Sequence, residues 1–231
     1  METLLPPSLD PDAIRAALPP DAVVGRQILI FEETDSTNDL ARRAGDDGLP
    51  EGLAIFAESQ RAGRGTSGRR WLSPPRQNLL FSVLLRPPVA VAPSRWPELT
   101  FCAALAVAEA AEQETGQVAR IKWPNDVLLD GRKVSGILLE SHQRQAPGFV
   151  VVGIGLNVLQ RAEDFAPELR ETAGSLAMAA PPAAPAMDRH RTAAAVLSRL
   201  GTLYASWPDG FAEIMAACER RGCLPPGEEA R

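Results

Sequence analysis

Cysteine and histidine are scarce in this chain of 231 residues, and their spacing is unlike that of folds stabilised by zinc or by disulfide bonds. The three cysteines, at positions 102, 218 and 223, form no C-x-x-C pair, and the two histidines are isolated in the sequence. This pattern argues against a structural zinc site and against a disulfide framework. It fits a protein of the reducing cytoplasm, and it assigns no metal ligands.

A basic surplus and a long apolar run are also lacking. The formal net charge is −5 at pH 7, whereas general nucleic-acid binders carry excess positive charge that neutralises phosphate. The longest apolar stretch, residues 99–111, is interrupted by Glu109, and a membrane span needs about 18 apolar residues. The N-terminus is acidic and broken by prolines, so we expect neither a signal peptide nor membrane association.

The apolar content of 45% is enough for a packed core. Residues 1–20 contain five prolines and predict an N-terminal extension with one short helical turn, and residues 21–231 predict a single domain. Apolar patterning predicts six strands, at residues 27–32, 53–58, 78–86, 118–122, 133–140 and 149–158. Helical periodicity predicts four helices, at residues 37–44, 98–115, 189–206 and 211–221.

Turn and stop signals lie between these segments. Gly116 is placed to end helix 98–115, and Asp130-Gly131 is a tight-turn dipeptide. Residues 160–188 predict a long irregular connection, and the tail from Leu224 is expected to fray. Strands joined by hairpins, with interspersed helices, predict an α+β fold in which a large mixed β-sheet is flanked by helices.

The segment Ala62-Gly-Arg-Gly-Thr-Ser-Gly-Arg-Arg-Trp71 is the strongest functional signal. Glycines let backbone N–H groups approach a ligand closely, and arginines grip carboxylate or phosphate with paired hydrogen bonds. The loop therefore favours an anionic ligand. Two alternatives stay open for the loop alone, a flexible solvated connection and a binding site for single-stranded RNA.

Polar residues beside this loop predict a second part of the site. Ser36-Thr37-Asn38 follows a strand, where the hydroxyls and the amide could hydrogen-bond a polar heterocycle or simply cap the next helix. Gln60 ends the strand before the loop and can donate and accept at once. A surface glutamine is the alternative interpretation.

Further along the chain, Lys122-Trp-Pro-Asn-Asp126 and Lys133 predict cations at strand ends. Lysine is a compact charge that can reach phosphate, although a strand-end lysine can also simply extend into water. Gly136 lies inside a strand, where it permits close approach to the backbone.

The strand 152–158 places Gly153, Gly155 and Asn157 on one face and apolar residues on the other. The first face predicts a bare shelf for a flat ring that ends in an amide. The alternative is a helix packed closely on the glycines.

Six motifs in this order resemble the catalytic domain of a biotin protein ligase of the biotin–[acetyl-CoA-carboxylase] ligase kind, in the biotin/lipoate protein ligase superfamily. They cover about residues 29–158, and they are Thr34-Asp-Ser-Thr-Asn38, Glu58-Ser-Gln60, Gly63-Arg-Gly-Thr-Ser-Gly-Arg-Arg-Trp71, Lys122-Trp-Pro-Asn-Asp126, Gly136-Ile-Leu-Leu-Glu140 and Gly153-Ile-Gly-Leu-Asn157. The resemblance implies a class II synthetase-like fold. It also implies that biotin and ATP, with Mg²⁺, form biotinyl-5′-adenylate, from which biotin passes to a lysine of a carboxylase's carrier domain.

The resemblance also assigns roles to residues. Lys122 and Arg64 are implied as catalytic cations. The implied biotin-binding residues are Ser36, Thr37, Asn38, Gln60, Gly63, Arg64, Trp71 and Gly136. The implied ATP-binding residues are Gly65, Thr66, Gly68, Arg69, Lys122, Asn125, Lys133 and Asn157.

The chain departs from the family pattern in three places. Thr66 stands where a second loop arginine is usual, so we expect weaker retention of the adenylate or reduced catalysis. No DNA-binding domain is expected before Ser36, and no C-terminal β-barrel after the last helix, so DNA is not an expected partner. A lipoate or octanoate ligase and a non-catalytic ligand-binding relative remain alternatives, and a homodimer is left open.

Overall fold

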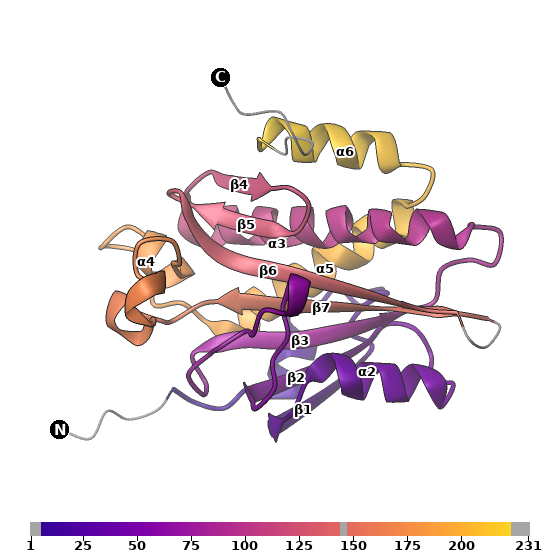
Figure 1. Cartoon of the computed structure of the whole chain (residues 1–231), viewed down its shortest axis with the longest axis horizontal. Coiled ribbons are helices and arrows are strands. Elements are labelled where there is room, and N and C mark those ends of the chain that lie inside the picture. The colour runs from indigo at the N-terminus through magenta and orange to yellow at the C-terminus, as the bar shows by residue number, and fades with distance from the viewer. Residues whose placement is uncertain (1–5, 144–146, 223–231) are drawn as a thin grey trace.

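The computed structural model describes residues 6–143 and 147–222. Seven strands form one sheet in the order β1-β2-β3-β7-β6-β5-β4 (Figure 1). The strands are β1 (Gln27–Thr34), β2 (Leu53–Gln60), β3 (Asn78–Leu85), β4 (Ala119–Lys122), β5 (Asp126–Leu129), β6 (Arg132–His142) and β7 (Phe149–Asn157). β1 and β2 are parallel and the other neighbours are antiparallel, so the predicted mixed sheet is confirmed.

Helices cover both faces of the sheet. They are α1 (Pro11–Ala16), α2 (Thr37–Asp46), α3 (Leu99–Thr115), α4 (Leu176–Ala179), α5 (Arg189–Ser206) and α6 (Phe211–Arg220). Figure 1 shows α3 and α5 on one side of the sheet and α2 on the other, and a separate cluster of buried apolar residues lies under each side. In the larger cluster the rings of Phe56 and Phe81 stack across β2 and β3, with centroids 4.7 Å apart.

The predicted stop and turn signals are confirmed at both positions. Gly116 ends α3 in a left-handed conformation with φ of 68°. Asp130 and Gly131 have φ values of 48° and 73°, the double positive φ of a tight hairpin turn between β5 and β6.

Strand β5 was not predicted. It is four residues long, a length at which alternation carries little signal, and the polar run Pro124-Asn-Asp126 leads into it. Its buried side chains, Val127 and Leu129, complete the larger core. The six-strand expectation was therefore wrong by one strand.

The segment before residue 21 is more than an extension. The predicted helical turn is α1, which begins after the N-cap Asp10, and Leu9 and Ile14 are buried in the larger core. The irregular connection 160–188 contains two short 3-10 turns and α4. The tail from Leu224 lies outside the described residues.

A fully buried ion pair fixes the end of β2. Glu58 and Arg189 of α5 are 2.6 Å apart, and their side chains are 1% and 3% exposed. Arg189 also donates to the carbonyl of Pro7, and the backbone N–H of Leu9 donates to Glu58. The pair therefore ties together β2, α5 and the segment that precedes α1.

We predict that Arg189→Met will lower the free energy of unfolding by about 3–5 kcal/mol, because Glu58 is left as an unpaired buried charge. Urea unfolding monitored by circular dichroism measures this loss. The control is Arg42→Met, which breaks the exposed i,i+4 pair with Asp46 and should cost about 0.3–0.5 kcal/mol. Equal losses in the two variants would contradict the prediction.

Candidate active site

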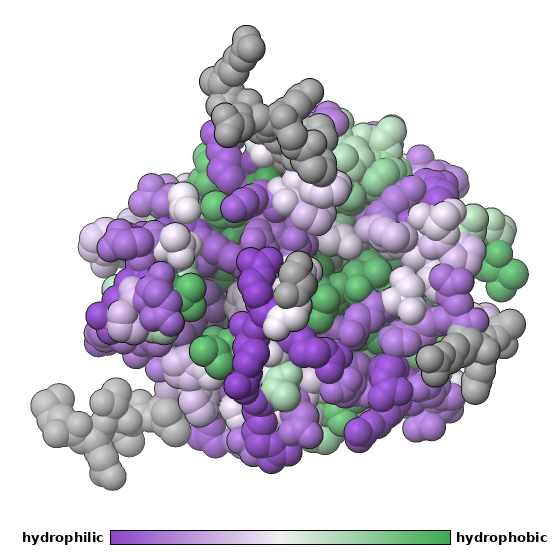
Figure 2. All heavy atoms as spheres, in the orientation of Figure 1, coloured by the Kyte–Doolittle hydropathy of each residue, from purple (hydrophilic) through white to green (hydrophobic). Residues whose placement is uncertain are grey.

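A cavity of about 460 Å³ lies between the start of α2, the loop that follows β2, and strands β6 and β7. The turn between β4 and β5 and the segment 165–173 complete its wall. Figure 2 shows a band of strongly hydrophilic residues across the middle of this face, where the loop after β2 crosses the sheet in Figure 1. The structure therefore brings segments from most of the chain to one cavity.

Most of the residues predicted for the site line this cavity. They are Ser36, Thr37, Asn38, Gln60, Arg64, Gly65, Thr66, Arg69, Trp71, Lys122, Asn125, Lys133, Gly136 and Asn157. Gly63 and Gly68 are not among the lining residues, and their roles in binding biotin and ATP stay predictions. A Cβ at Gly63 would lie 2.6 Å from the carbonyl oxygen of Trp71, so glycine there lets the two ends of the loop close on each other. Gly68 is exposed, with φ of 74°, at the tip of the loop.

The polar residues at the start of α2 form a buried network. The side-chain oxygen of Gln60 accepts from the backbone N–H of Thr37 at 2.8 Å. The hydroxyls of Thr37 and Ser82 are 2.7 Å apart, and that of Ser82 lies 2.6 Å from Oδ1 of Asn38. Ser36 occupies the N-cap position, yet its side chain makes no capping hydrogen bond. The capping interpretation therefore does not account for Ser36.

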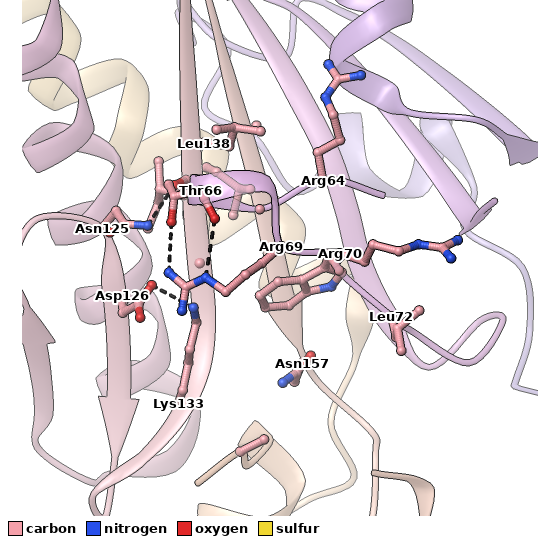
Figure 3. A pocket seen from close by; sticks show the side chains of 18 of the residues that line it. Arg64, Thr66, Arg69, Arg70, Leu72, Asn125, Asp126, Lys133, Leu138 and Asn157 are labelled. Carbon is pink, nitrogen blue, oxygen red and sulfur yellow. Dashed lines mark hydrogen bonds and ion pairs between the residues drawn. The ribbon is translucent and has the colours of Figure 1, made fainter. Parts of the chain in front are cut away.

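Arg64 lines the cavity, but its guanidinium is turned toward two carboxylates. It donates to both oxygens of Asp39 on α2, at 2.9 and 3.0 Å, and to Glu140 of β6 at 3.3 Å. Hydrogen bonding to Asp39 raises the pKa of Arg64. Asn38 donates to the same Glu140 at 2.8 Å, which connects Arg64 to the buried network. Figure 3 shows the Arg64 side chain extending away from Lys133 and Arg69.

The predicted glycine shelf on β7 exists, and protein covers it. A Cβ at Gly155 would lie 2.6 Å from the Trp71 ring, and one at Gly136 would lie 3.0 Å from the same ring. A Cβ at Gly153 would meet the side chain of Asn38. The alternative interpretation therefore holds at Gly153, where the start of α2 packs on the strand. The bare shelf was wrong, because the Trp71 indole occupies the space over Gly155.

Two positive side chains, those of Lys133 and Arg69, lie near Trp71. The amine of Lys133 forms an ion pair with Asp126 at 2.7 Å and lies 5.7 Å from the centre of the Trp71 ring. Figure 3 shows the Arg69 guanidinium pointing to the same region, held by Thr66. Arg69 donates from Nη2 to the Thr66 hydroxyl at 3.0 Å and from Nε to the Thr66 carbonyl at 3.2 Å. Thr66 itself carries no charge. Its two hydrogen bonds with Arg69 nevertheless hold that guanidinium in place.

Sequence patterning did not identify the wall formed by residues 165–173. Phe165, Leu169, Thr172 and Ala173 line the same cavity as Trp71. Backbone hydrogen bonds join Lys133 to Thr172 and Gly174, at 2.7 and 2.9 Å. Asn157 donates from Nδ2 to the carbonyl of Gly174 at 2.9 Å. The amide predicted to contact a nucleotide is thus already used to hold this wall.

A second unpredicted residue, Asn78, connects the two walls. Its amide nitrogen donates to Gln160 at 2.6 Å and to Ser73 at 2.9 Å, and its oxygen accepts from the backbone N–H of Val158. Ser73 lies two residues after Trp71, and Gln160 begins the segment that leads to the opposite wall. Asn78 is 2% exposed, and a polar residue at the start of a strand that is apolar except at Ser82 was the signal available in the sequence.

The model of the biotin/lipoate A/B protein ligase family matches residues 30–157, more than half of the chain. The chain belongs to this family. A biotin–[acetyl-CoA-carboxylase] ligase of Mycobacterium tuberculosis is 36% identical over 98% of this chain and 82% of that relative. The structure of a biotin protein ligase from Aquifex aeolicus, in complex with biotin and ATP, is 31% identical with a TM-score of 0.70, covering 88% of this chain and 81% of that one.

Some members of the ligase family are longer than this chain. The bifunctional ligase/repressor BirA of Bacillus subtilis is 36% identical over 76% of this chain, and the match spans 53% of that relative. The chain thus spans about half the length of such ligase/repressors. Within the described part of this family member, no helix is long and apolar enough to cross a bilayer.

We predict that Gly155→Ala will destabilise the protein by about 1–3 kcal/mol, because the added methyl group displaces the Trp71 ring from β7. Urea unfolding of the variant, of Trp71→Ala and of the double variant measures the coupling between the two positions. The Gly155→Ala cost should largely disappear when Trp71 is already alanine. A cost that is the same in both backgrounds would show that the ring is not what the methyl group meets.

Proposed function

We propose that this chain joins biotin and ATP into biotinyl-5′-adenylate and transfers biotin to a lysine of a carrier domain. The observation that carries the proposal is that Lys122, Lys133 and Arg69 line one cavity beside a buried polar network. The named relatives support biotin and ATP as substrates and the biotin carrier domain of a carboxylase as acceptor.

The first step brings two anions together. An oxygen of the biotin carboxylate attacks the α-phosphorus of ATP, a P–O bond forms, and pyrophosphate leaves with the electron pair of the broken bond. Two unit charges about 4 Å apart repel by about 1 kcal/mol in water and by about 4 kcal/mol at an effective dielectric constant near 20. Fixed positive side chains offset this repulsion and the charge that develops in the transition state.

Three cations in the cavity suit this step. Lys122, at the end of β4, bridges the biotin carboxylate and the α-phosphate. Lys133 and Arg69 hold the remaining phosphate oxygens, since both already point to one region beside Trp71. Thr66 keeps Arg69 in that direction through two hydrogen bonds.

The uncharged end of biotin requires different partners. Its ureido group has two donors and one acceptor, and each costs about 1–3 kcal/mol if it is buried without a partner. Ser36, Thr37 and Gln60 supply hydroxyls and an amide to the lining of the cavity. The Trp71 ring forms the apolar wall beside the chain that links this group to the carboxylate.

Mg²⁺ is expected with ATP, and Asp126 fits a role as its protein ligand. Asp126 is the acidic side chain among the described residues that line the cavity, and its Oδ1 has no hydrogen-bond donor other than the Lys133 ammonium. Mg²⁺ is usually bound by one or two carboxylates together with substrate phosphates. The ion would neutralise phosphate charge, while Lys133 would then turn to the nucleotide.

The transfer step releases AMP. The neutral ε-amine of the carrier's lysine attacks the acyl carbon of the adenylate, and a C–N bond forms. The C–O bond to the phosphate breaks, AMP leaves, and the nitrogen loses a proton.

Mass spectrometry of a biotin carrier domain tests the proposal. After incubation with this protein, ATP, Mg²⁺ and biotin, the carrier should gain one biotinyl group. Lys122→Met removes the charge at similar volume, and the rate should fall by about 10²–10³-fold, as for loss of one transition-state contact. Arg43→Met, an exposed cation on α2, is the control and should leave the rate unchanged. An unmodified carrier, or a carrier that is modified only when lipoate is supplied instead of biotin, would overturn the proposed function.

The ion pairs of Arg64 generate a separate prediction. Arg64 must exchange Asp39 for the biotin carboxylate, so Asp39→Asn should tighten biotin binding by up to about fivefold, the value of one exposed ion pair. Biotinamide has no carboxylate, and its affinity should stay the same. Isothermal titration calorimetry measures both, with Asp46→Asn at the other end of α2 as the control. A parallel change for the two ligands would refute the exchange.

A further inference from the structure

Lysine is almost absent from this chain. Of its 24 lysine and arginine residues, two are lysines, Lys122 and Lys133, and all the others are arginines. Both lysines line the cavity, and Lys133 is engaged by Asp126. The sequence therefore has no lysine outside its candidate active site.

Ion pairing does not account for arginine everywhere on the surface. Many arginines do form pairs with carboxylates, for which the guanidinium geometry is better suited than an ammonium. Arg43 and Arg120, however, are exposed, and neither forms an ion pair within the described residues. A lysine would serve equally well for solubility at such positions.

The difference between the two side chains is chemical. An acyl adenylate reacts with a neutral amine, and a lysine with a pKa of about 10.4 is neutral in about 0.04% of molecules at pH 7. An arginine stays protonated at any accessible pH, so its nitrogens have no lone pair for the acyl carbon. Replacing lysine by arginine keeps the charge and removes the nucleophile.

The loop gives the adenylate a route to the surface. Thr66 contributes no charge to the cavity, and Gly65, Thr66 and Arg69 on the cavity wall are partly or fully exposed. An adenylate held by fewer cations dissociates more often, and it would then meet the enzyme's own surface before any other.

We propose that the lysine-free exterior protects this protein from acylation by its own adenylate. The inference rests on the proposed function, because it requires that the chain form an acyl adenylate. The reaction avoided is attack of a surface ε-amine on the acyl carbon, with formation of an amide bond, loss of a proton and departure of AMP. Lys122 and Lys133, the two lysines of the cavity, are exempt because phosphate and carboxylate oxygens engage them.

Single Arg→Lys variants test the proposal. Arg170→Lys places an amine beside Leu169 of the cavity wall, and Arg15→Lys places one on α1, which packs on the opposite face of the sheet. Each variant is incubated with biotin, ATP and Mg²⁺ without a carrier, digested with a glutamate-specific protease, and analysed by mass spectrometry. A parallel sample with the carrier domain reports the proposed function independently.

We expect biotin on the introduced lysine, with total self-biotinylation at least about tenfold above wild type, since the new side chain supplies a titratable amine where there was none. Labelling should be greater at position 170 than at position 15, because the adenylate hydrolyses and dilutes as it diffuses. Adding Thr66→Arg should lower labelling at both positions by retaining the adenylate.

The samples with and without the carrier domain distinguish the proposed function from the protective role of arginine. If the carrier is biotinylated while both introduced lysines stay unmodified, the proposed function stands and the protective role of arginine is wrong. If wild type is itself modified at Lys122 or Lys133 to the same extent as the variants, the protective role is also wrong. If the carrier stays unmodified, the proposed function fails first.

Discussion

The cavity depends on the packing of the Trp71 indole against the backbone of β6 and β7. Gly136 and Gly155 leave room for the ring, and any side chain there would push it away from the sheet. Once the ring lies on the strands, the loop that carries it must cross the sheet, and Arg69 reaches the region of Lys133 (Figure 3). The absence of side chains at Gly136 and Gly155 therefore determines that Arg69 and Lys133 lie close together.

Buried hydrogen bonds hold the surrounding walls at fixed positions. Asn78 connects the end of the loop at Ser73 to the opposite segment at Gln160, and Asn157 holds Gly174. A buried amide that loses its partners is costly, so such contacts specify one arrangement of the walls. Arg64 differs, because its partners are half-exposed carboxylates that water and anionic ligands can replace. The site thus combines a rigid floor with one exchangeable cation.

The sequence predicted all but one strand of the sheet, the longer helices and nearly half of the residues that line the cavity, for reasons that are local. The apolar run of β3, the alternation of β7 and the Asp130-Gly131 turn each depend on a few adjacent residues. The features that it did not predict depend on distant partners. Asp39 and Glu140 matter because Arg64 lies between them, and Phe165 lines the cavity because Asn157 and Lys133 hold its segment. The hydrophobic periodicity of the sequence does not predict contacts between residues that lie so far apart in the chain.

The buried pair of Glu58 and Arg189 has a consequence for how the family-matched segment should be regarded. Residues 30–157 contain Glu58, but its partners Leu9 and Arg189 lie on either side of that range. A fragment trimmed to the matched residues would place a carboxylate in an apolar environment with nothing to neutralise it. The family-matched segment and the folding unit are therefore different lengths of polypeptide, and the flanking helices belong to the second.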